Sequence, residues 1–498
     1  MCRRHPIVRV NIAVLAAIAA FSILLVREVQ AQEPNALGLP CNTTSDAIAP
    51  DRKVAIPIDA ALLTGRIPCA EAVNPAGPLG DDQLRNLQRG FDFYSWLTFI
   101  ALNAPASGTG IANSQPGTKA KWEDTQNFIQ LLEVMRRDRK EPEWNREDRT
   151  ALIPQACRSD YTKGMMVVEM IEESYNQPFR TGPLIDQRGR FAIFDILMNK
   201  EMFDYIMKHG LHRQSTQKKF ADRVDFPAGD SNTLGSFMLK VSWKVMDAED
   251  DPRKFHTTDA IVILPRREDE AGEPACMKAT LGLIGFHAVH KTIGRLQWIW
   301  TSFEHVDNVP EQIEVDAGPA RLKKSYNFFD PSCDRRKCPV NETPPRPWAP
   351  NNSLRHHTPF QSQITRVVPL TEDTKDINAK FQALLGNTVW KNYMLIGTQW
   401  PSDFRCARGR VDPNAPPPKP GTPPGTDFEK EPDMNCVPAP AFLANATLET
   451  FSQGEIPQAS SNCIGCHGNA TTFRGSTSSK VRAFNQSDFT FILEKAVP

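Results

Sequence analysis

The sequence has no excess of charge of either sign, because 58 Lys and Arg residues balance 58 Asp and Glu residues. A nucleic-acid-binding domain usually carries a basic patch or stripe, so the composition predicts no nucleic-acid partner. Sequence motifs of several enzyme classes are also missing: there is no glycine-rich phosphate loop, no HExxH and no nucleophile elbow. Beyond residue 31 no stretch is apolar enough to span a membrane.

The one long apolar segment lies at the N-terminus. Three basic residues, Arg3, Arg4 and Arg9, precede an apolar run over residues 12–26, and a small-residue cleavage site ends at Ala31. This order is typical of a secretory signal peptide. The run is also shorter than the roughly 20 residues that a transmembrane helix needs. We therefore expect residues 1–31 to be removed, leaving a periplasmic or secreted chain without a transmembrane span. An uncleaved signal anchor is the alternative.

Cysteine usage agrees with export. Of the 11 cysteines, Cys2 would leave with the signal peptide, and two belong to a motif described below. The remaining eight form an even number, which suggests disulfides in an oxidising compartment. Near neighbours in the chain are the preferred pairs, and elimination leaves the last pair: Cys41–Cys69, Cys333–Cys338, Cys406–Cys436 and Cys157–Cys276. The alternative is that some of them are buried thiols.

The pattern of apolar residues predicts an α+β fold. Apolar residues at three- and four-residue spacing indicate helices, whereas alternation indicates half-buried strands. Helices are expected at 82–103, 122–136, 200–209 and 489–496. Strands are expected at 191–196, 237–245, 260–264, 279–290, 297–303 and 392–399. The central region should therefore be mainly antiparallel β structure with inserted helices.

Proline-rich stretches suggest how the chain is divided. The segment 413–424 contains so many prolines that it cannot form a helix or an interior strand, and it is interpreted as a linker. We expect five segments: a signal peptide (1–31), an irregular N-terminal arm (32–80), an α+β scaffold domain (81–410), a proline-rich linker (411–435) and a small, mainly helical C-terminal unit (436–498).

The C-terminal unit contains the motif Cys463-Ile464-Gly465-Cys466-His467. Two thiols three residues apart lie on one face of a helix. They can form thioethers with the two vinyl groups of haem, and the adjacent His467 can present its imidazole to the iron. A redox-active dithiol would be expected after a strand, and none is indicated before Cys463. Half of a zinc site would need a second ligand pair, and none follows.

At this motif the chain resembles the cytochrome c family. The specific match covers about residues 462–473, and the whole chain more loosely resembles large secreted bacterial proteins of that family that have no assigned role. The resemblance implies one covalently bound haem c. Cys463 and Cys466 would attach it, and His467 would be the proximal iron ligand.

The second iron ligand is not supplied by the motif. Small carriers of this family have a Met ligand downstream of the motif, but here only 31 residues follow His467, and none is Met or His. The distal ligand must therefore come from upstream. His290 is the preferred candidate, followed by His305 and then His287, and Met434 is a further one. His287 and His290 should point to opposite faces of a strand.

These features predict an electron-transfer protein with one covalent haem and a redox partner protein. A haem-dependent oxidoreductase, peroxidase- or oxygenase-like, with an open distal site and a small-molecule substrate is the first alternative. In that case the acid–base sequence Glu304-His305-Val306-Asp307 could deliver protons. A surface or periplasmic binding protein in which the haem is structural is the second alternative.

Overall fold

The computed structural model describes residues 63, 67, 80–108, 110–115, 117–146, 148–220, 224–229, 233–265, 274–323, 325–401, 438–454, 462–468, 470–472 and 487–498. Several predictions lie outside these residues. They are the signal peptide, most of the N-terminal arm, the linker 411–435, Met434, and the pairs Cys41–Cys69 and Cys406–Cys436.

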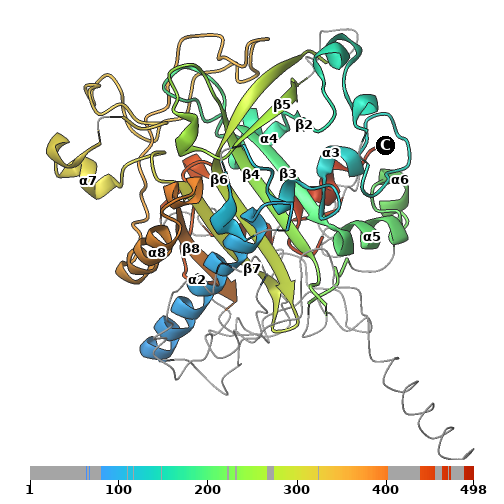
Figure 1. The fold of residues 1–498 in the computed structure, drawn as a ribbon, viewed down its shortest axis with the longest axis horizontal. Coiled ribbons are helices and arrows are strands. Elements are labelled where there is room, and N and C mark those ends of the chain that lie inside the picture. Colours follow the sequence, from blue (N-terminus) through green and yellow to red (C-terminus); the bar gives the residue numbers. More distant parts are fainter. Residues whose placement is uncertain are drawn as a thin grey trace, which may run out of the picture.

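Among the described residues, a nine-stranded sheet forms the centre of the structure (Figure 1). Its main path runs β1-β3-β4-β6-β7-β8-β9, and β5 pairs with the N-terminal half of β6 and with β2 on its other side. Of the described pairs, β2–β5 is parallel and the others are antiparallel. The strands are β1 (Phe128–Gln130), β2 (Met166–Glu169), β3 (Ile193–Asn199), β4 (Phe237–Val245), β5 (Thr257–Ile263), β6 (Cys276–Thr292), β7 (Arg295–His305), β8 (Tyr393–Pro401) and β9 (Pro438–Ala439). The predicted α+β class with a large antiparallel sheet is confirmed.

Helices flank the sheet and fill the connections (Figure 1). The α-helices are α2 (Asp81–Asn103), α3 (Leu131–Val134), α4 (Glu172–Tyr175), α5 (Lys200–His209), α6 (Gln214–Gln217), α7 (Gln312–Asp316), α8 (Glu372–Leu384) and α9 (Cys463–His467). The short 3-10 helices are η2 (Ile111–Asn113), η3 (Lys121–Glu123), η4 (Thr150–Leu152), η5 (Gln155–Asp160), η6 (Pro178–Arg180), η7 (Pro252–Lys254), η8 (Pro319–Arg321), η9 (Val389–Asn392), η12 (Thr450–Ser452) and η14 (Phe491–Lys495).

One face of the sheet packs against α2 and α8. The apolar stripe of α2 buries Trp96 and Phe99 in the largest core cluster. The Phe99 ring stacks on Phe303 of β7 with ring centroids 4.1 Å apart, and the Trp96 ring stacks on Phe381 of α8 at 4.9 Å. Such buried aromatic pairs stabilise the packing of this layer beyond the burial of their apolar area. The expected helix at 82–103 is confirmed as α2.

The predicted helix at 122–136 is wrong. The segment instead contains η3, strand β1 and the single turn α3. The Asp124 side chain accepts a hydrogen bond from the Gln126 backbone at 3.0 Å, a local turn that competes with helix continuation. Pairing of residues 128–130 with β3 at the sheet edge is then more favourable than continuing a helix. Apolar spacing alone could not reveal this tertiary pairing.

The opposite face of the sheet is covered by α5 and C-terminal residues. A second core cluster combines Met198 and Met238 of the sheet with Ile464, Ile492 and Leu493 from the C-terminal part. We expected a separate, mainly helical C-terminal unit. Among its described residues, Ile464, Ile492 and Leu493 share this core cluster with the sheet, and β9 pairs with β8. The expected terminal helix at 489–496 is the 3-10 turn η14.

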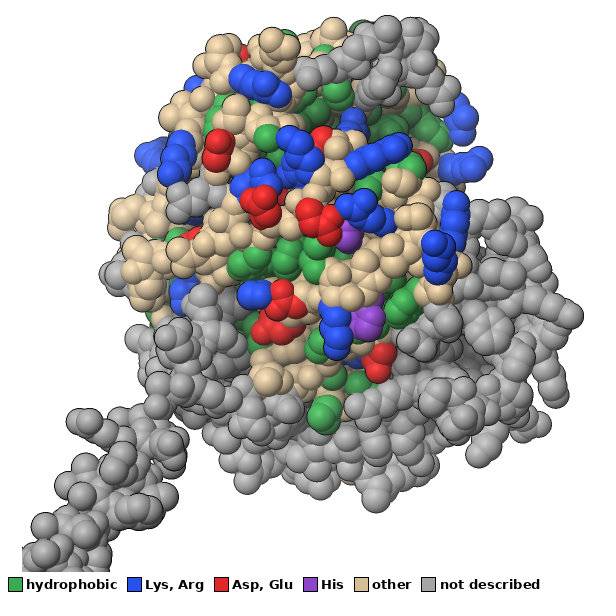
Figure 2. Space-filling model, turned by 90° about the vertical axis from the view of Figure 1, so that its right-hand side faces the viewer, with side chains coloured by type: hydrophobic (Ala, Val, Ile, Leu, Met, Phe, Trp, Pro, Cys, Tyr) green, Lys and Arg blue, Asp and Glu red, His purple; other side chains and the backbone are tan. Residues whose placement is uncertain are grey.

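Two predicted disulfides are confirmed: Cys157–Cys276 and Cys333–Cys338. The first joins η5 to the start of β6 across 119 residues, and the second closes a loop of sequence separation 5. Within the described residues, no helix is both long and apolar enough to cross a membrane. The face that carries α5 and α6 shows Lys, Arg, Asp and Glu side chains interspersed rather than a field of one sign (Figure 2).

Candidate functional site

The residues Cys463–His467 form the single helical turn α9. Asn462 is the N-cap, and its side chain accepts a hydrogen bond from the Gly465 backbone. A Cβ atom on Gly465 would lie 2.6 Å from the Asn462 side-chain oxygen, so a larger residue here would require the capping side chain to shift. Cys463 and Cys466 are thiols rather than disulfide partners, and both are partly exposed. The turn therefore presents two thiols three residues apart, as the motif predicts.

His467 is held in one orientation by the last residues of the chain. Its Nδ1 donates a hydrogen bond to the backbone carbonyl of Phe489 at 2.8 Å. The ring also packs against Trp300 and Phe491, with centroids 4.4 and 5.1 Å away. Burial lowers the pKa of His467 to about 4, so the imidazole is neutral at pH 7. A neutral imidazole with its proton on Nδ1 has its lone pair on Nε2, which is the form that binds a metal.

A cavity of about 510 Å³ opens beside α9. Its volume is in the range of small-molecule and cofactor pockets. The two cysteines and His467 line it together with residues of three further groups. From the sheet come Ile196, Met238, Lys240, His287, Val289 and Trp300; from the C-terminal part come Leu443 and Glu449; and from α4 and the turn after it come Glu173, Phe179 and Arg180.

The register of the sheet explains which strand residues reach this cavity. Met238 of β4 pairs with Val289 of β6, and Val289 in turn pairs with Trp300 of β7. Lys240 pairs with His287 in the same way. Paired residues share a face, and neighbours along a strand alternate. The sheet thus forms one wall of the cavity, with an apolar part and a polar part.

The cavity combines apolar surface with a histidine–carboxylate pair. The Nε2 atom of His287 lies 3.2 Å from both carboxylate oxygens of Glu449. Within the described residues its Nδ1 atom makes no hydrogen bond. Burial by itself raises the pKa of the Glu449 carboxyl, but the charge and hydrogen bond of His287 outweigh it and lower that pKa to about 2. His287 therefore has one committed and one uncommitted ring nitrogen.

The environment of the two thiols does not favour a reactive dithiol. Burial and the nearby Glu449 carboxylate raise the pKa of Cys463 well above its usual value, and they raise the pKa of Cys466 to about 11. A thiol–disulfide oxidoreductase depends on a cysteine whose pKa is lowered, because the thiolate is the nucleophile. This pair is held in the thiol form at neutral pH.

Two of the histidines favoured as distal ligands do not line this cavity. His290 packs on the opposite face of β6, where its Nδ1 lies 2.6 Å from the Tyr94 hydroxyl and its Nε2 lies 2.5 Å from the Leu234 carbonyl oxygen. Both of its ring nitrogens are thus engaged. His287, ranked third from the sequence, is the one of the three that lies beside Cys463, Cys466 and His467. His287 and His290 point to opposite faces of β6, as the alternation along a strand predicts. The sequence does not indicate which of the two faces lines the cavity.

His305 is also engaged elsewhere. Its Nε2 lies 2.9 Å from the Lys254 carbonyl oxygen, and its Nδ1 accepts a hydrogen bond from the Asp307 backbone at 3.1 Å. The ring stacks on Phe255 with centroids 4.2 Å apart. The acid–base sequence around His305 therefore does not face the cavity.

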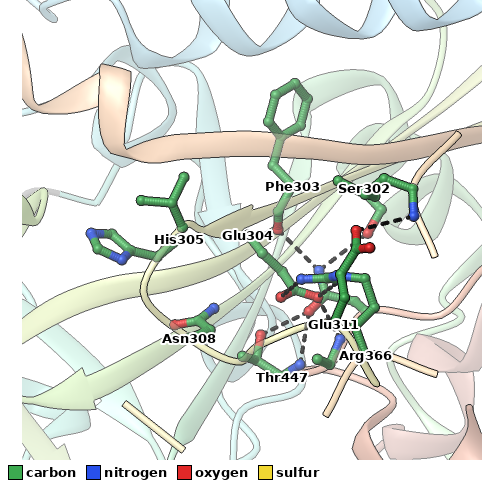
Figure 3. Close-up of polar contacts among 12 residues, drawn as sticks. Ser302, Phe303, Glu304, His305, Asn308, Glu311, Arg366 and Thr447 are labelled. Atoms are coloured by element: carbon green, nitrogen blue, oxygen red, sulfur yellow. Dashed lines mark hydrogen bonds and ion pairs between the residues drawn. The ribbon is translucent and has the colours of Figure 1, made fainter. Parts of the chain in front are cut away.

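The neighbouring Glu304 has a structural partner instead. Its carboxylate forms a buried pair with Arg366, with Arg366 Nη2 at 2.9 Å from Glu304 Oε2, and it accepts a hydrogen bond from the Ala446 backbone at 2.5 Å. Figure 3 shows Glu304 and Arg366 meeting beside Thr447, whereas the His305 ring points away from them. The pair fastens the segment around Asn445 to β7, and Asn445 donates to the Phe303 carbonyl at 2.9 Å. This segment carries Glu449 to the cavity.

Within the described ranges, no three His, Cys, Asp or Glu side chains are grouped so that they could hold a metal ion by themselves. No family model, no curated protein and no solved structure matches the chain.

Proposed function

We propose that this chain is an exported mono-haem c-type cytochrome that transfers electrons. Cys463 and Cys466 would hold the haem through thioether bonds, and His467 would bind the iron through Nε2. The bound haem would supply one-electron redox chemistry. The observation that carries the proposal is the His467–Phe489 hydrogen bond, because it fixes a neutral imidazole next to two thiols at a cavity.

The surroundings support a protein-enclosed cofactor. The cavity wall offers apolar surface from Ile196, Val289 and Trp300, which can exclude water from one side of a flat macrocycle. His287 offers a ring nitrogen without a hydrogen bond to the described residues, and it is therefore the best-placed candidate for the second iron ligand. Iron with two protein ligands suits electron transfer, because it needs no position for a substrate. The remaining surface would then serve a redox partner protein.

The His287–Glu449 pair also favours a second candidate function. A histidine oriented by a carboxylate is a typical general acid–base unit. If His287 does not bind the iron, this pair would lie beside an open coordination position, as a haem-dependent oxidoreductase with a small-molecule substrate requires. The visible and electron paramagnetic resonance spectra of the purified holoprotein separate the two functions. Low-spin iron that does not bind added cyanide or carbon monoxide supports electron transfer. High-spin iron that binds them supports the oxidoreductase.

Covalent attachment is tested first, by producing the full chain with a cytochrome c maturation system and measuring its intact mass. The wild-type chain should be coloured and heavier than the processed polypeptide by one haem. The double variant Cys463→Ala/Cys466→Ala should have the mass of the bare polypeptide. The matched control is Cys333→Ala/Cys338→Ala, which also removes two nearby cysteines but should keep the haem. A colourless wild-type chain with the bare mass would refute the proposal.

A further inference from the structure

The carbonyl that holds His467 belongs to a turn with an unusual backbone. Asp488 and Phe489 are consecutive residues with φ of 52° and 63°. Residues other than glycine rarely adopt this left-handed region, and a bulky residue such as Phe does so least readily. Strain of this kind persists only where surrounding interactions enforce it, and it often marks a functional site. The turn therefore needs an anchor.

The anchor is a fully buried ion pair. The Lys291 ammonium lies 2.6 Å from Asp488 Oδ2, and both side chains have 0% exposure. The same carboxylate oxygen accepts a hydrogen bond from the Phe226 backbone at 2.8 Å. Lys291 is itself fixed near the end of β6, because its backbone N–H donates to Ser236 at 3.0 Å and its carbonyl accepts from Gly229 at 2.8 Å. The sheet thus holds the side chain of the residue before Phe489.

Further hydrogen bonds link the strained turn to His467 in a closed ring. The Ala470 backbone N–H donates to the His467 carbonyl at 3.0 Å, and the Ser487 backbone N–H donates to the Ala470 carbonyl at 3.1 Å. Ser487 and Thr490 bond to each other across the turn, with the Thr490 hydroxyl 2.9 Å from the Ser487 carbonyl. The Phe489 carbonyl then returns to His467 Nδ1. Each hydrogen bond of this ring helps to fix the position of the Phe489 carbonyl relative to α9.

We infer that Lys291 and Asp488 are positioning residues for His467: their buried ion pair holds the strained turn that directs the Phe489 carbonyl at Nδ1. This inference rests on the proposed function, since it concerns the iron ligand of that site. When the ring nitrogen of a ligating histidine that does not bind the metal donates a hydrogen bond, the bond fixes the ring and raises its basicity. A more basic ligand stabilises the ferric state and lowers the midpoint potential of the haem.

The test compares variants that keep the CxxCH motif intact. Asp488→Ala removes the ion pair and the side chain that tolerates the left-handed backbone. The midpoint potential of its holoprotein should shift to more positive values, and the iron–histidine stretching vibration, measured in the His287→Ala background where the ferrous iron would be five-coordinate, should fall in frequency. Asp488→Asn keeps an oxygen for the Phe226 N–H and favours the same backbone region, so it should shift both quantities in the same direction but less. It also serves if Asp488→Ala does not fold.

The matched control is Asp225→Asn. Asp225 is the other carboxylate on Lys291, 2.6 Å from its ammonium, but it is 43% exposed and outside the turn. Its removal changes the local charge equally without releasing Phe489, so the potential and the vibration should stay near the wild-type values. The inference is overturned if both quantities are unchanged in folded Asp488→Asn, or if Asp225→Asn shifts them as much. Wild-type protein without covalent haem would instead overturn the proposed function.

Discussion

At the scale of single residues, the two histidines of β6 illustrate how one strand serves two purposes. His287 faces the cavity, where Glu449 holds one ring nitrogen. His290, three residues later, lies in the core on the α2 side and bridges Tyr94 and Leu234. The two residues have the same side chain. The face of β6 on which each one lies makes His287 a candidate ligand and His290 a structural residue.

His287→Ala and His290→Ala should therefore differ in kind. In the His287→Ala holoprotein we expect cyanide or carbon monoxide to bind at least about tenfold more tightly, because the proposed second iron ligand is removed; about 1.4 kcal/mol corresponds to that factor. His290→Ala should leave the spectrum and the binding unchanged. It should lower the free energy of unfolding by about 1–3 kcal/mol, because the buried Tyr94 hydroxyl loses its partner. Spectral titration and urea denaturation measure the two effects. A changed spectrum in His290→Ala alone would contradict this assignment.

At the scale of elements, the cavity depends on how the C-terminal segments are fastened to β7. The Glu304–Arg366 pair is nearly inaccessible, with side-chain exposures of 0% and 1%. Glu304 also binds the Ala446 backbone, so the pair couples the loop at Arg366, strand β7 and the segment that leads to Glu449. A buried pair of this kind contributes little compared with an apolar replacement of both partners, but removing one partner is costly.

Arg366→Met should destabilise the protein by about 3–5 kcal/mol, because it leaves the Glu304 carboxylate buried without its cation. The free energy of unfolding from urea denaturation checks this value. The control is Arg336→Met, which removes an arginine that is 89% exposed and paired with Asp334, and it should change stability by less than about 1 kcal/mol. Equal effects of the two substitutions would show that the buried pair has no special role.

At the scale of the whole molecule, the two disulfides within the described residues constrain very different lengths of chain. Cys157–Cys276 closes a loop of sequence separation 119 that contains β2 to β5, whereas Cys333–Cys338 closes one of separation 5. In the chain-entropy description, a disulfide stabilises by limiting the unfolded chain, and the gain grows with the length of the loop.

Cys157→Ala/Cys276→Ala should thus lower the free energy of unfolding by about 4–5 kcal/mol under oxidising conditions, and Cys333→Ala/Cys338→Ala by about 2 kcal/mol. Urea denaturation of both double variants measures the difference. Dithiothreitol should bring the wild-type protein toward the less stable variant. A larger loss from the short loop would contradict the entropic explanation.

Local patterns in the sequence were sufficient for much of the scaffold. The predicted strand 237–245 and helix 200–209 coincide with β4 and α5, because alternation and three- to four-residue spacing are local properties. Helix α8 was not predicted, although Thr371 at its N-cap and the acidic Glu372 and Asp373 in its first turn are a readable start signal. The short strand β1 had no such signal, because it exists through pairing with β3.

The sequence by itself determined the chemistry of the candidate site: two thiols and an imidazole on one helical turn, capped by Asn462 and permitted by Gly465. Only the tertiary structure decided which partners surround that turn. It placed His287, rather than His290 or His305, at the cavity, and it brought Phe489 to His467 from 22 residues away. The physical reason is that strand register and the packing of the C-terminal segments bring residues from distant parts of the chain to the same cavity. Local spacing in the sequence does not encode which face of the sheet lines that cavity.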